Sequence, residues 1–282
     1  MSGAYSEKAL TFDCAGETLV GVLSLPASPG TRGVLIVVGG PQYRVGSHRQ
    51  FTLLARHLAS SGIPALRFDY RGMGDSTGEV RSFEAVSDDL HRAIDAFFEH
   101  APMLKDVVIW GLCDAASAAL IYAHRDARVR GLVLLNPWVR TVQGLARAEL
   151  KHYYGARLLT RAFWGKLLSG EVNVLQSVRS LAASAAAAVA PGKRNEGPAS
   201  LPDRMHDGLR RFQGKALLVL SGNDLTAQEF KDAAAGSPAW QALLQQPRIA
   251  RCELPEANHT FSTRAWRDRV ADWTCDWVKH ID

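Results

Sequence analysis

Short runs of consecutive apolar residues alternate along this chain with longer stretches in which apolar residues recur every three or four positions. The short runs are typical of strands buried on both faces of a parallel sheet, and the longer stretches are typical of amphipathic helices. This alternation predicts an α/β fold, with a mostly parallel central sheet, helices on its faces and right-handed crossovers. The predicted strands are 34–38, 64–68, 107–110 and 131–135, and the predicted helices are 50–61, 82–100 and 115–124.

The two ends of the chain add further elements to this sheet. Segments 9–12 and 19–23, in which apolar and polar residues alternate, flank a turn that contains Gly16, and they predict an antiparallel hairpin. Near the other end, apolar runs at 216–220 and 249–254 predict two more strands, followed by a final helix.

The alternation is interrupted between residues 138 and 211, where helix-like segments occur but no strand is predicted. The middle of this region, near 182–202, is rich in Ala, Ser, Gly and Pro. We interpret 138–211 as a helical cap insertion with a mobile segment near 182–202. The core domain is then formed by residues 1–137 and 212–282.

Length and composition exclude several classes of protein. The 282 residues are enough for one large core, and fractions of 47% hydrophobic and 22% charged residues are ordinary for a globular protein. No run reaches the roughly 20 apolar residues of a membrane span, and the first residues lack the apolar segment of a signal peptide. The net charge of +5 comes without a basic block, so no nucleic-acid partner is expected. We expect a cytoplasmic protein.

The cysteines and glycines give no indication of a metal or a cofactor. Cys14, Cys113, Cys252 and Cys275 are widely separated, no pair has metal-ligand spacing, and a disulfide framework is not expected in a long chain without a secretion signal. The glycine pair at 39–40 lacks the Gly-Lys-Ser/Thr ending of a phosphate-binding loop.

The sequence Gly-Leu-Cys-Asp-Ala at 111–115 lies between a predicted buried strand and a helix of small residues. A nucleophile on such a strand-to-helix turn needs a strained backbone, and small residues two positions before and after it prevent collisions. The N-terminus of the following helix favours the thiolate form of a cysteine. Cys113 is therefore the predicted nucleophile. The alternative is a buried structural cysteine, because free cysteines are often buried.

Two further residues complete a predicted catalytic triad. Asp224 follows the predicted strand at 216–220 and could orient a histidine, or it could only cap the next turn. His259 follows the last predicted strand and is the predicted base. The order nucleophile, acid, histidine is the order of hydrolases that place the nucleophile on a strand-to-helix turn. Asp126 is a more distant alternative for the acid.

An oxyanion formed at Cys113 needs N–H donors. We expect the main-chain N–H of Asp114 to be one donor and the loop after residue 38 to supply the other. Pro41 has no N–H, so Gln42 is the predicted second donor, through its main chain or its amide.

Other residues near the predicted site are candidates for binding substrate. Gly40, Arg44, His48 and Arg49 belong to the loop at 39–49, where the cations could hold an anionic group or could simply be solvated. Trp138 begins the predicted cap and could form an apolar wall, together with the cap aromatics Tyr153, Tyr154, Phe163 and Trp164.

Taken together, these motifs resemble the α/β-hydrolase superfamily over nearly the whole chain. The resemblance rests on Asp-Tyr-Arg-Gly-Met-Gly-Asp-Ser at 69–76, the turn at 111–115, Asp224 and His259. The loop at 37–49 with the turn at 111–115 is more narrowly similar to exosortase A system-associated hydrolase 1 proteins. This resemblance implies an α/β-hydrolase fold and an association with exopolysaccharide and PEP-CTERM sorting genes. A cysteine nucleophile is also similar to that of dienelactone hydrolases.

The predicted activity is hydrolysis of a small-molecule ester or thioester through an acyl-enzyme on Cys113. Two alternatives stay open. The same triad could transfer the acyl group to an alcohol, or the chain could be a non-catalytic binding protein with the same fold. The sequence does not define the oligomeric state.

Overall fold

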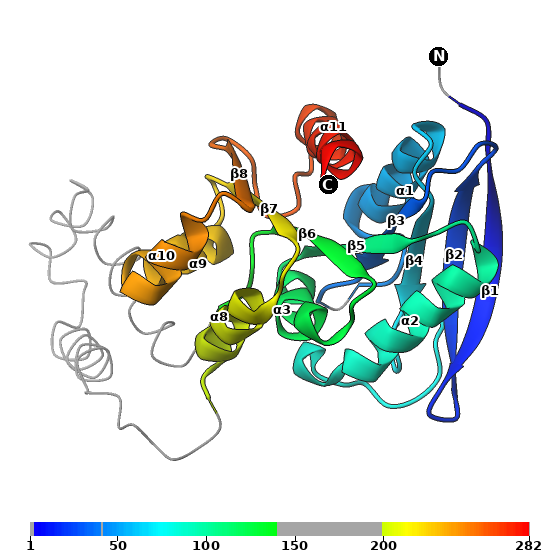
Figure 1. Ribbon diagram of the computed structural model, residues 1–282, viewed down its shortest axis with the longest axis horizontal. Coiled ribbons are helices and arrows are strands. Elements are labelled where there is room, and N and C mark those ends of the chain that lie inside the picture. Colours follow the sequence, from blue (N-terminus) through cyan, green and yellow to red (C-terminus); the bar gives the residue numbers. More distant parts are fainter. Residues whose placement is uncertain (1–2, 41, 140–198, 282) are drawn as a thin grey trace, which may run out of the picture. The chain divides into compact units, whose positions relative to one another are not determined.

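The computed structural model describes residues 3–40, 42–139 and 199–281, and its strands form one eight-stranded sheet (Figure 1). The order across the sheet is β1-β2-β4-β3-β5-β6-β7-β8, and all neighbours from β4 to β8 are parallel. The predicted, mostly parallel sheet is therefore confirmed. The strands are β1 (Tyr5–Cys14), β2 (Glu17–Pro26), β3 (Arg32–Val37), β4 (Ala65–Asp69), β5 (Asp106–Leu112), β6 (Val129–Leu135), β7 (Lys215–Ser221) and β8 (Ile249–Leu254).

The hairpin predicted at the start of the chain forms one edge of this sheet. Strand β1 pairs antiparallel with β2, from Tyr5 opposite Pro26 to Cys14 opposite Glu17. Gly16 lies in the turn at φ 82°, in the left-handed region where a residue without a Cβ is favoured. Strand β2 then pairs antiparallel with β4 and joins the hairpin to the parallel strands.

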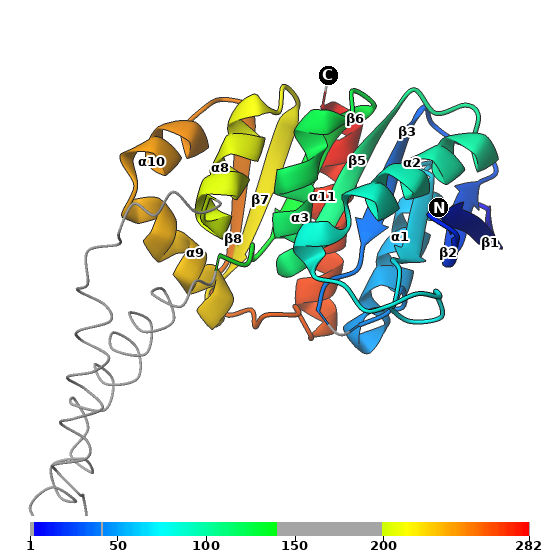
Figure 2. The same ribbon diagram turned by 90° about the horizontal axis from the view of Figure 1, so that it is seen from below.

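Helices cover both faces of the sheet (Figures 1 and 2). Helices α1 and α11 lie on one face, and α2, α3 and α8 lie on the other. Packing against the sheet is close, since a Cβ added to Gly33 of β3 would lie 2.6 Å from Phe97 of α2. The helices are α1 (Gln50–Ser60), α2 (Ser87–His100), α3 (Asp114–Tyr122), α8 (Leu201–Arg211), α9 (Leu225–Ala235), α10 (Pro238–Leu244) and α11 (Arg264–His280), with short 3₁₀ turns at Ser47–Arg49, Phe83–Ala85 and Ala123–Arg125.

The helical segments differ from the prediction in two places. The helix predicted at 82–100 is divided at Val86, whose φ of −102° and ψ of 16° are not helical; a 3₁₀ turn capped by Ser82 precedes α2. Helices α9 and α10 were not predicted. Both begin at a side chain that accepts a main-chain N–H, Asp224 for α9 and Ser237 for α10, and such N-caps are helix-start signals in the sequence.

The chain divides into two compact units, 1–138 with 204–282, and 139–203. Most of the predicted cap at 138–211, and nearly all of the segment at 182–202, lies outside the described residues. The end of the predicted cap is described, and from Arg204 onward it belongs to the same unit as the sheet. Among the helices that are described, none is long and apolar enough to cross a membrane.

The loop at 69–76 is tied to the core by a buried ion pair. Asp89 of α2 is fully buried and accepts hydrogen bonds from the main-chain N–H of Arg71, at 2.9 Å, and from two nitrogens of its guanidinium, at 3.0 and 2.8 Å. Removing one partner of a buried pair leaves the other charge uncompensated, which is strongly destabilising.

We predict that Asp89→Ala lowers the free energy of unfolding by about 3 kcal/mol, because the Arg71 guanidinium would stay buried with only the exposed Asp88 carboxylate nearby, at 3.7 Å. Asp88→Ala is the matched control, since the neighbouring Asp88 side chain is 80% exposed and should contribute within about 0.5 kcal/mol. Urea unfolding followed by circular dichroism measures both values. Equal midpoints for the two variants would contradict the assigned role of the pair.

Candidate active site

Cys113 lies on a sharp turn between β5 and α3. Its φ of 63° and ψ of −124° place it in a region that residues with a Cβ rarely adopt, and it is the N-cap residue of α3. Gly111 makes this turn possible, because a Cβ there would lie 2.7 Å from the carbonyl carbon and oxygen of Ala115. The strained turn expected for a nucleophile is therefore present, and the side chain of Cys113 is partly exposed rather than enclosed in the core.

The structure brings Asp224 and His259 together at the same edge of the sheet. Nδ1 of His259 lies 2.9 Å from Oδ2 of Asp224. The carboxylate also accepts the main-chain N–H groups of Thr226 and Ala227, at 3.2 and 3.1 Å, and so caps α9. The same carboxylate thus caps α9 and faces His259, so the two roles considered from the sequence are compatible with each other.

His259 links Asp224 to Cys113. The hydrogen bond with Asp224, followed by a second one with Cys113, raises the pKa of His259 to about 10 against the opposing effect of burial. Burial alone would raise the pKa of Asp224, but its hydrogen bond with His259 holds that pKa below the ordinary value. The three side chains predicted to form a triad therefore lie together, with His259 between Asp224 and Cys113. Asp126, the alternative acid, instead binds Tyr122 and Arg128.

Asn136 holds the loop that carries His259 in place, a role that was not predicted from the sequence. It is fully buried at the end of β6, where its Nδ2 donates to Oγ of Ser221 at 2.8 Å and to the carbonyl oxygen of His259 at 3.1 Å. Its Oδ1 accepts the Ser221 N–H at 2.9 Å. Asn136 therefore joins the ends of β6 and β7 to the loop that carries His259. A polar residue directly after the apolar run at 131–135 was the available indication.

The carboxylate of Asp114, the first residue of α3, contacts the loop after β3. Its two oxygens are 2.7 and 2.9 Å from the Gly40 nitrogen, and Oδ1 is 2.9 Å from the Ala115 nitrogen. Burial raises the pKa of Asp114, while these N–H groups oppose the rise. Gly39 allows the approach, since a Cβ there would lie 2.5 Å from Oδ1 of Asp114.

The predicted second oxyanion donor, Gln42, is engaged elsewhere. Its main-chain N–H donates to the Gly40 carbonyl at 2.8 Å, and its side-chain Oε1 accepts both the N–H and the hydroxyl of Ser47. The geometry favours the Gly40 N–H instead, because this group points toward the turn that carries Cys113. The sequence favoured Gln42 because it does not reveal which N–H groups a tight turn uses internally.

Of the three cationic residues predicted to bind substrate, Arg44 is paired with acids, whereas His48 and Arg49 are exposed. Arg44 is held by the buried Asp69 and by Asp75, with its Nη2 2.6 Å from Asp75, so its charge is already paired within the loop. His48 and Arg49 are exposed, and both have positive φ just before α1.

Trp138 is hydrogen-bonded to the turn that carries Cys113. Its main-chain N–H donates to the Cys113 carbonyl at 3.2 Å, and its own carbonyl accepts the Ser117 hydroxyl at 2.7 Å. The four cap aromatics predicted to accompany it lie outside the described residues.

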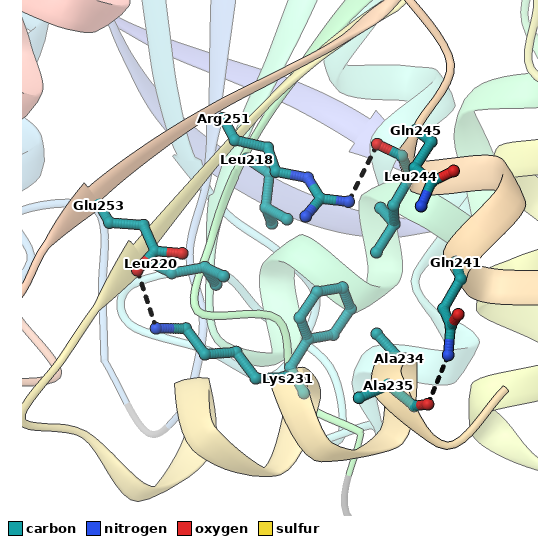
Figure 3. A pocket seen from close by; sticks show the side chains of 11 residues that line it. Leu218, Leu220, Lys231, Ala234, Ala235, Gln241, Leu244, Gln245, Arg251 and Glu253 are labelled. Carbon is teal, nitrogen blue, oxygen red and sulfur yellow. Dashed lines mark hydrogen bonds and ion pairs between the residues drawn. The ribbon is translucent and has the colours of Figure 1, made fainter.

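A separate pocket of about 590 Å³ lies between α9, α10 and the last two strands (Figure 3). Leu218, Leu220 and Phe230 are among its lining residues, and none of the predicted site residues lines it. Its charged side chains are engaged, Lys231 with Glu253 at 3.1 Å and Arg251 with the Leu244 carbonyl at 2.9 Å. Within the part of the chain that the structure describes, no group of three His, Cys, Asp or Glu side chains could hold a metal ion.

The fold and this site define an α/β hydrolase. A sequence profile of the alpha/beta hydrolase family matches residues 34–273, so the chain belongs to that family.

Solved structures with this fold include the esterase Pf2001 of Pyrococcus furiosus, with a TM-score of 0.66 and 13% identity over 98% of this chain and 93% of that one. Another is a dienelactone hydrolase of Anabaena variabilis, with a TM-score of 0.62 and 18% identity over 98% of both chains. Among curated proteins, a polyketide transferase, grgF, of a Penicillium species is 30% identical over 129 residues, which are 44% of this chain and 42% of that protein. The chain thus spans less than half the length of this relative.

We predict that the His259 imidazole titrates near pH 10, because Asp224 and Cys113 both stabilise its protonated form. Since this pKa exceeds the ordinary value of 6.5, the interaction stabilises the fold fully below pH 6.5 and is lost as the pH rises to about 10. Asp224→Asn should lower the midpoint by at least about two pH units. NMR of the ring proton measures the titration. A His259 midpoint at the ordinary value of 6.5 would refute this prediction.

Proposed function

We propose that this α/β hydrolase cleaves a small-molecule ester or thioester through an acyl-enzyme on Cys113. The observation that carries the proposal is the placement of His259 between Cys113 and Asp224, with its Nδ1 2.9 Å from Asp224 and Cys113 on a strained turn. Such a chain supplies a thiolate, a proton carrier and a group that orients the carrier, which are the parts that acyl transfer needs.

The first half-reaction forms the acyl-enzyme. The Cys113 thiolate attacks the carbonyl carbon, an S–C bond forms, and the carbonyl electrons move to oxygen. The Gly40 N–H points toward the turn, and together with the main-chain N–H of Asp114 it can bind this oxyanion. The intermediate then collapses, the bond to the leaving group breaks, and protonated His259 gives that group its proton.

The second half-reaction restores the enzyme. Neutral His259 takes a proton from water, and the hydroxide attacks the thioester carbon. Collapse of this second intermediate breaks the S–C bond, releases the acid and leaves the Cys113 thiolate beside protonated His259. Asp224 stays ionised throughout and holds the ring through Nδ1. The structures with this fold include an esterase and a dienelactone hydrolase, which supports an ester as substrate.

Acyl transfer to an alcohol is the second candidate. It is favoured by the similarity to a polyketide transferase, although this chain covers only 42% of that protein. The chemistry differs only in the second half-reaction, where an alcohol replaces water. The association with exosortase and exopolysaccharide genes and the cytoplasmic location stay expectations drawn from the sequence.

We predict one covalent acyl group on the wild-type protein after brief exposure to activated acyl esters and thioesters, measured by intact-protein mass spectrometry. Cys113→Ala should form no adduct, because no other thiol lies on a strained turn beside a histidine and an acid in the described part of the chain. His259→Ala should keep any adduct longer, because nothing then activates water. An adduct of equal yield on Cys113→Ala would contradict the proposal, and added alcohols that shorten the adduct lifetime would favour transfer.

The other cysteines provide internal controls for this experiment. Burial raises the pKa of Cys14 and Cys252, which disfavours their thiolates. Burial also disfavours the Cys275 thiolate, but hydrogen bonds from His57 and Ser61 outweigh it and lower that pKa, so Cys275 is the stricter control. It is only 4% exposed, and we expect iodoacetamide to label Cys113 at least about tenfold faster. Equal labelling would instead favour the non-catalytic binding protein.

A further inference from the structure

The residue after the proposed nucleophile carries an acid side chain that turns back onto the site. Asp114 occupies the first turn of α3, where a carboxylate commonly bonds only to the N–H groups of its own helix. Here the carboxylate also reaches the loop after β3, and both of its oxygens lie within 2.9 Å of the Gly40 nitrogen.

One of the two groups that hold this carboxylate is a donor that the proposed reaction needs for its oxyanion. The Gly40 N–H donates to the Asp114 side chain, at 2.7 Å from Oδ1 and 2.9 Å from Oδ2, while the Ala115 N–H is the other donor. An oxyanion and a carboxylate both accept short hydrogen bonds through negatively charged oxygen. The two cannot accept the same Gly40 N–H in full at the same time, and two anions in one small site repel each other.

We propose that the Asp114 carboxylate is a built-in anion that occupies the Gly40 N–H, one of the two proposed oxyanion donors, in the resting enzyme and must withdraw before an acyl donor can react. This inference rests on the proposed function of Cys113. It makes the Asp114 side chain a determinant of rate and selectivity, since substrates must displace it. The same carboxylate would slow the reaction of simple neutral esters.

Two features of the site fit this role. Gly39 leaves the space that the carboxylate fills, since any side chain there would collide with Oδ1 of Asp114 and with the Leu112 carbonyl. Burial also raises the pKa of Asp114, so its carboxylate is neutralised more readily than that of an exposed acid. A neutral Asp114 competes less strongly for the Gly40 N–H.

Charged and titratable neighbours determine how the rate should depend on pH. Those facing Asp114 are His259, Tyr70 and the adjacent Cys113. Burial, and then the charge of Asp114, raise the pKa of Tyr70 to about 12, while the pKa of His259 is about 10. Neither His259 nor Tyr70 changes charge between pH 5 and pH 7.5, and Cys113 is common to the wild type and the Asp114 variants. A pH-dependent difference in acylation rate between them therefore reports on the Asp114 carboxyl.

The test compares acylation of the wild type, Asp114→Asn, Asp114→Ala and the control Asp88→Asn by a p-nitrophenyl ester. Asp88 lies in the first turn of α2, remote in the chain from the nucleophile turn, and its side chain is 80% exposed. We expect Asp114→Asn to acylate about tenfold faster at pH 7.5, because a missing oxyanion donor can cost roughly 10²-fold or more and the amide oxygen still competes in part. The acylation rate of Asp114→Ala should increase by at least the same factor, and the rate of Asp88→Asn should equal that of the wild type.

The pH dependence provides the second measurement. The ratio of the Asp114→Asn rate to the wild-type rate should fall toward one as the pH is lowered toward the pKa of the Asp114 carboxyl, which burial raises above its ordinary value.

The outcomes separate the two proposals. A wild type that acylates Cys113 while both Asp114 variants react at the same rate or more slowly overturns the inference alone, since the carboxylate would then serve to hold the loop at 39–40. Absence of any adduct on Cys113 in wild type and variants removes the proposed function itself. Faster acylation at Cys113 in both variants, with a rate ratio that falls at lower pH, establishes Asp114 as the resting occupant of the Gly40 oxyanion donor.

Discussion

The backbone conformation of Cys113 is the constraint on which the rest of the site depends. A φ of 63° at a residue with a Cβ is maintained only where surrounding structure holds it, and here the end of β5 and the start of α3 meet within one residue. The turn lifts the thiol toward His259 and brings Asp114 to the loop after β3. The turn needs a residue without a side chain at Gly111 and at Gly39, because a Cβ at either position would collide with main-chain atoms.

The sheet explains why residues far apart in sequence meet at this turn. Strands β5, β6 and β7 are parallel neighbours, so their carboxyl ends lie at one edge. Cys113 follows the first of them, Asn136 the second and Asp224 the third, while His259 follows β8. Asn136 adds a buried set of hydrogen bonds that ties the last two loops together. The proposed chemistry thus uses residues supplied by the edge of a rigid sheet rather than by one flexible loop.

Much of this arrangement could be predicted from the sequence because it follows from periodicity and chain order. Apolar runs place the strands, and the order of Cys113, Asp224 and His259 after three of them implies that they meet. The choice between Gly40 and Gln42 could not be predicted, since it depends on which N–H groups a tight turn uses internally. The position of the Asp114 carboxylate and the role of Asn136 likewise depend on side-chain conformations between segments distant in the chain.

The most direct test of the account is a crystal structure of His259→Ala soaked with an activated ester, since the loss of the base should preserve the acyl group. The account predicts a thioester on Sγ of Cys113, with its carbonyl oxygen within hydrogen-bond distance of the Gly40 and Asp114 nitrogens and the Asp114 carboxylate turned away from Gly40. An acyl group on another residue, with Cys113 unmodified, would contradict the central claim that this strained turn carries the nucleophile.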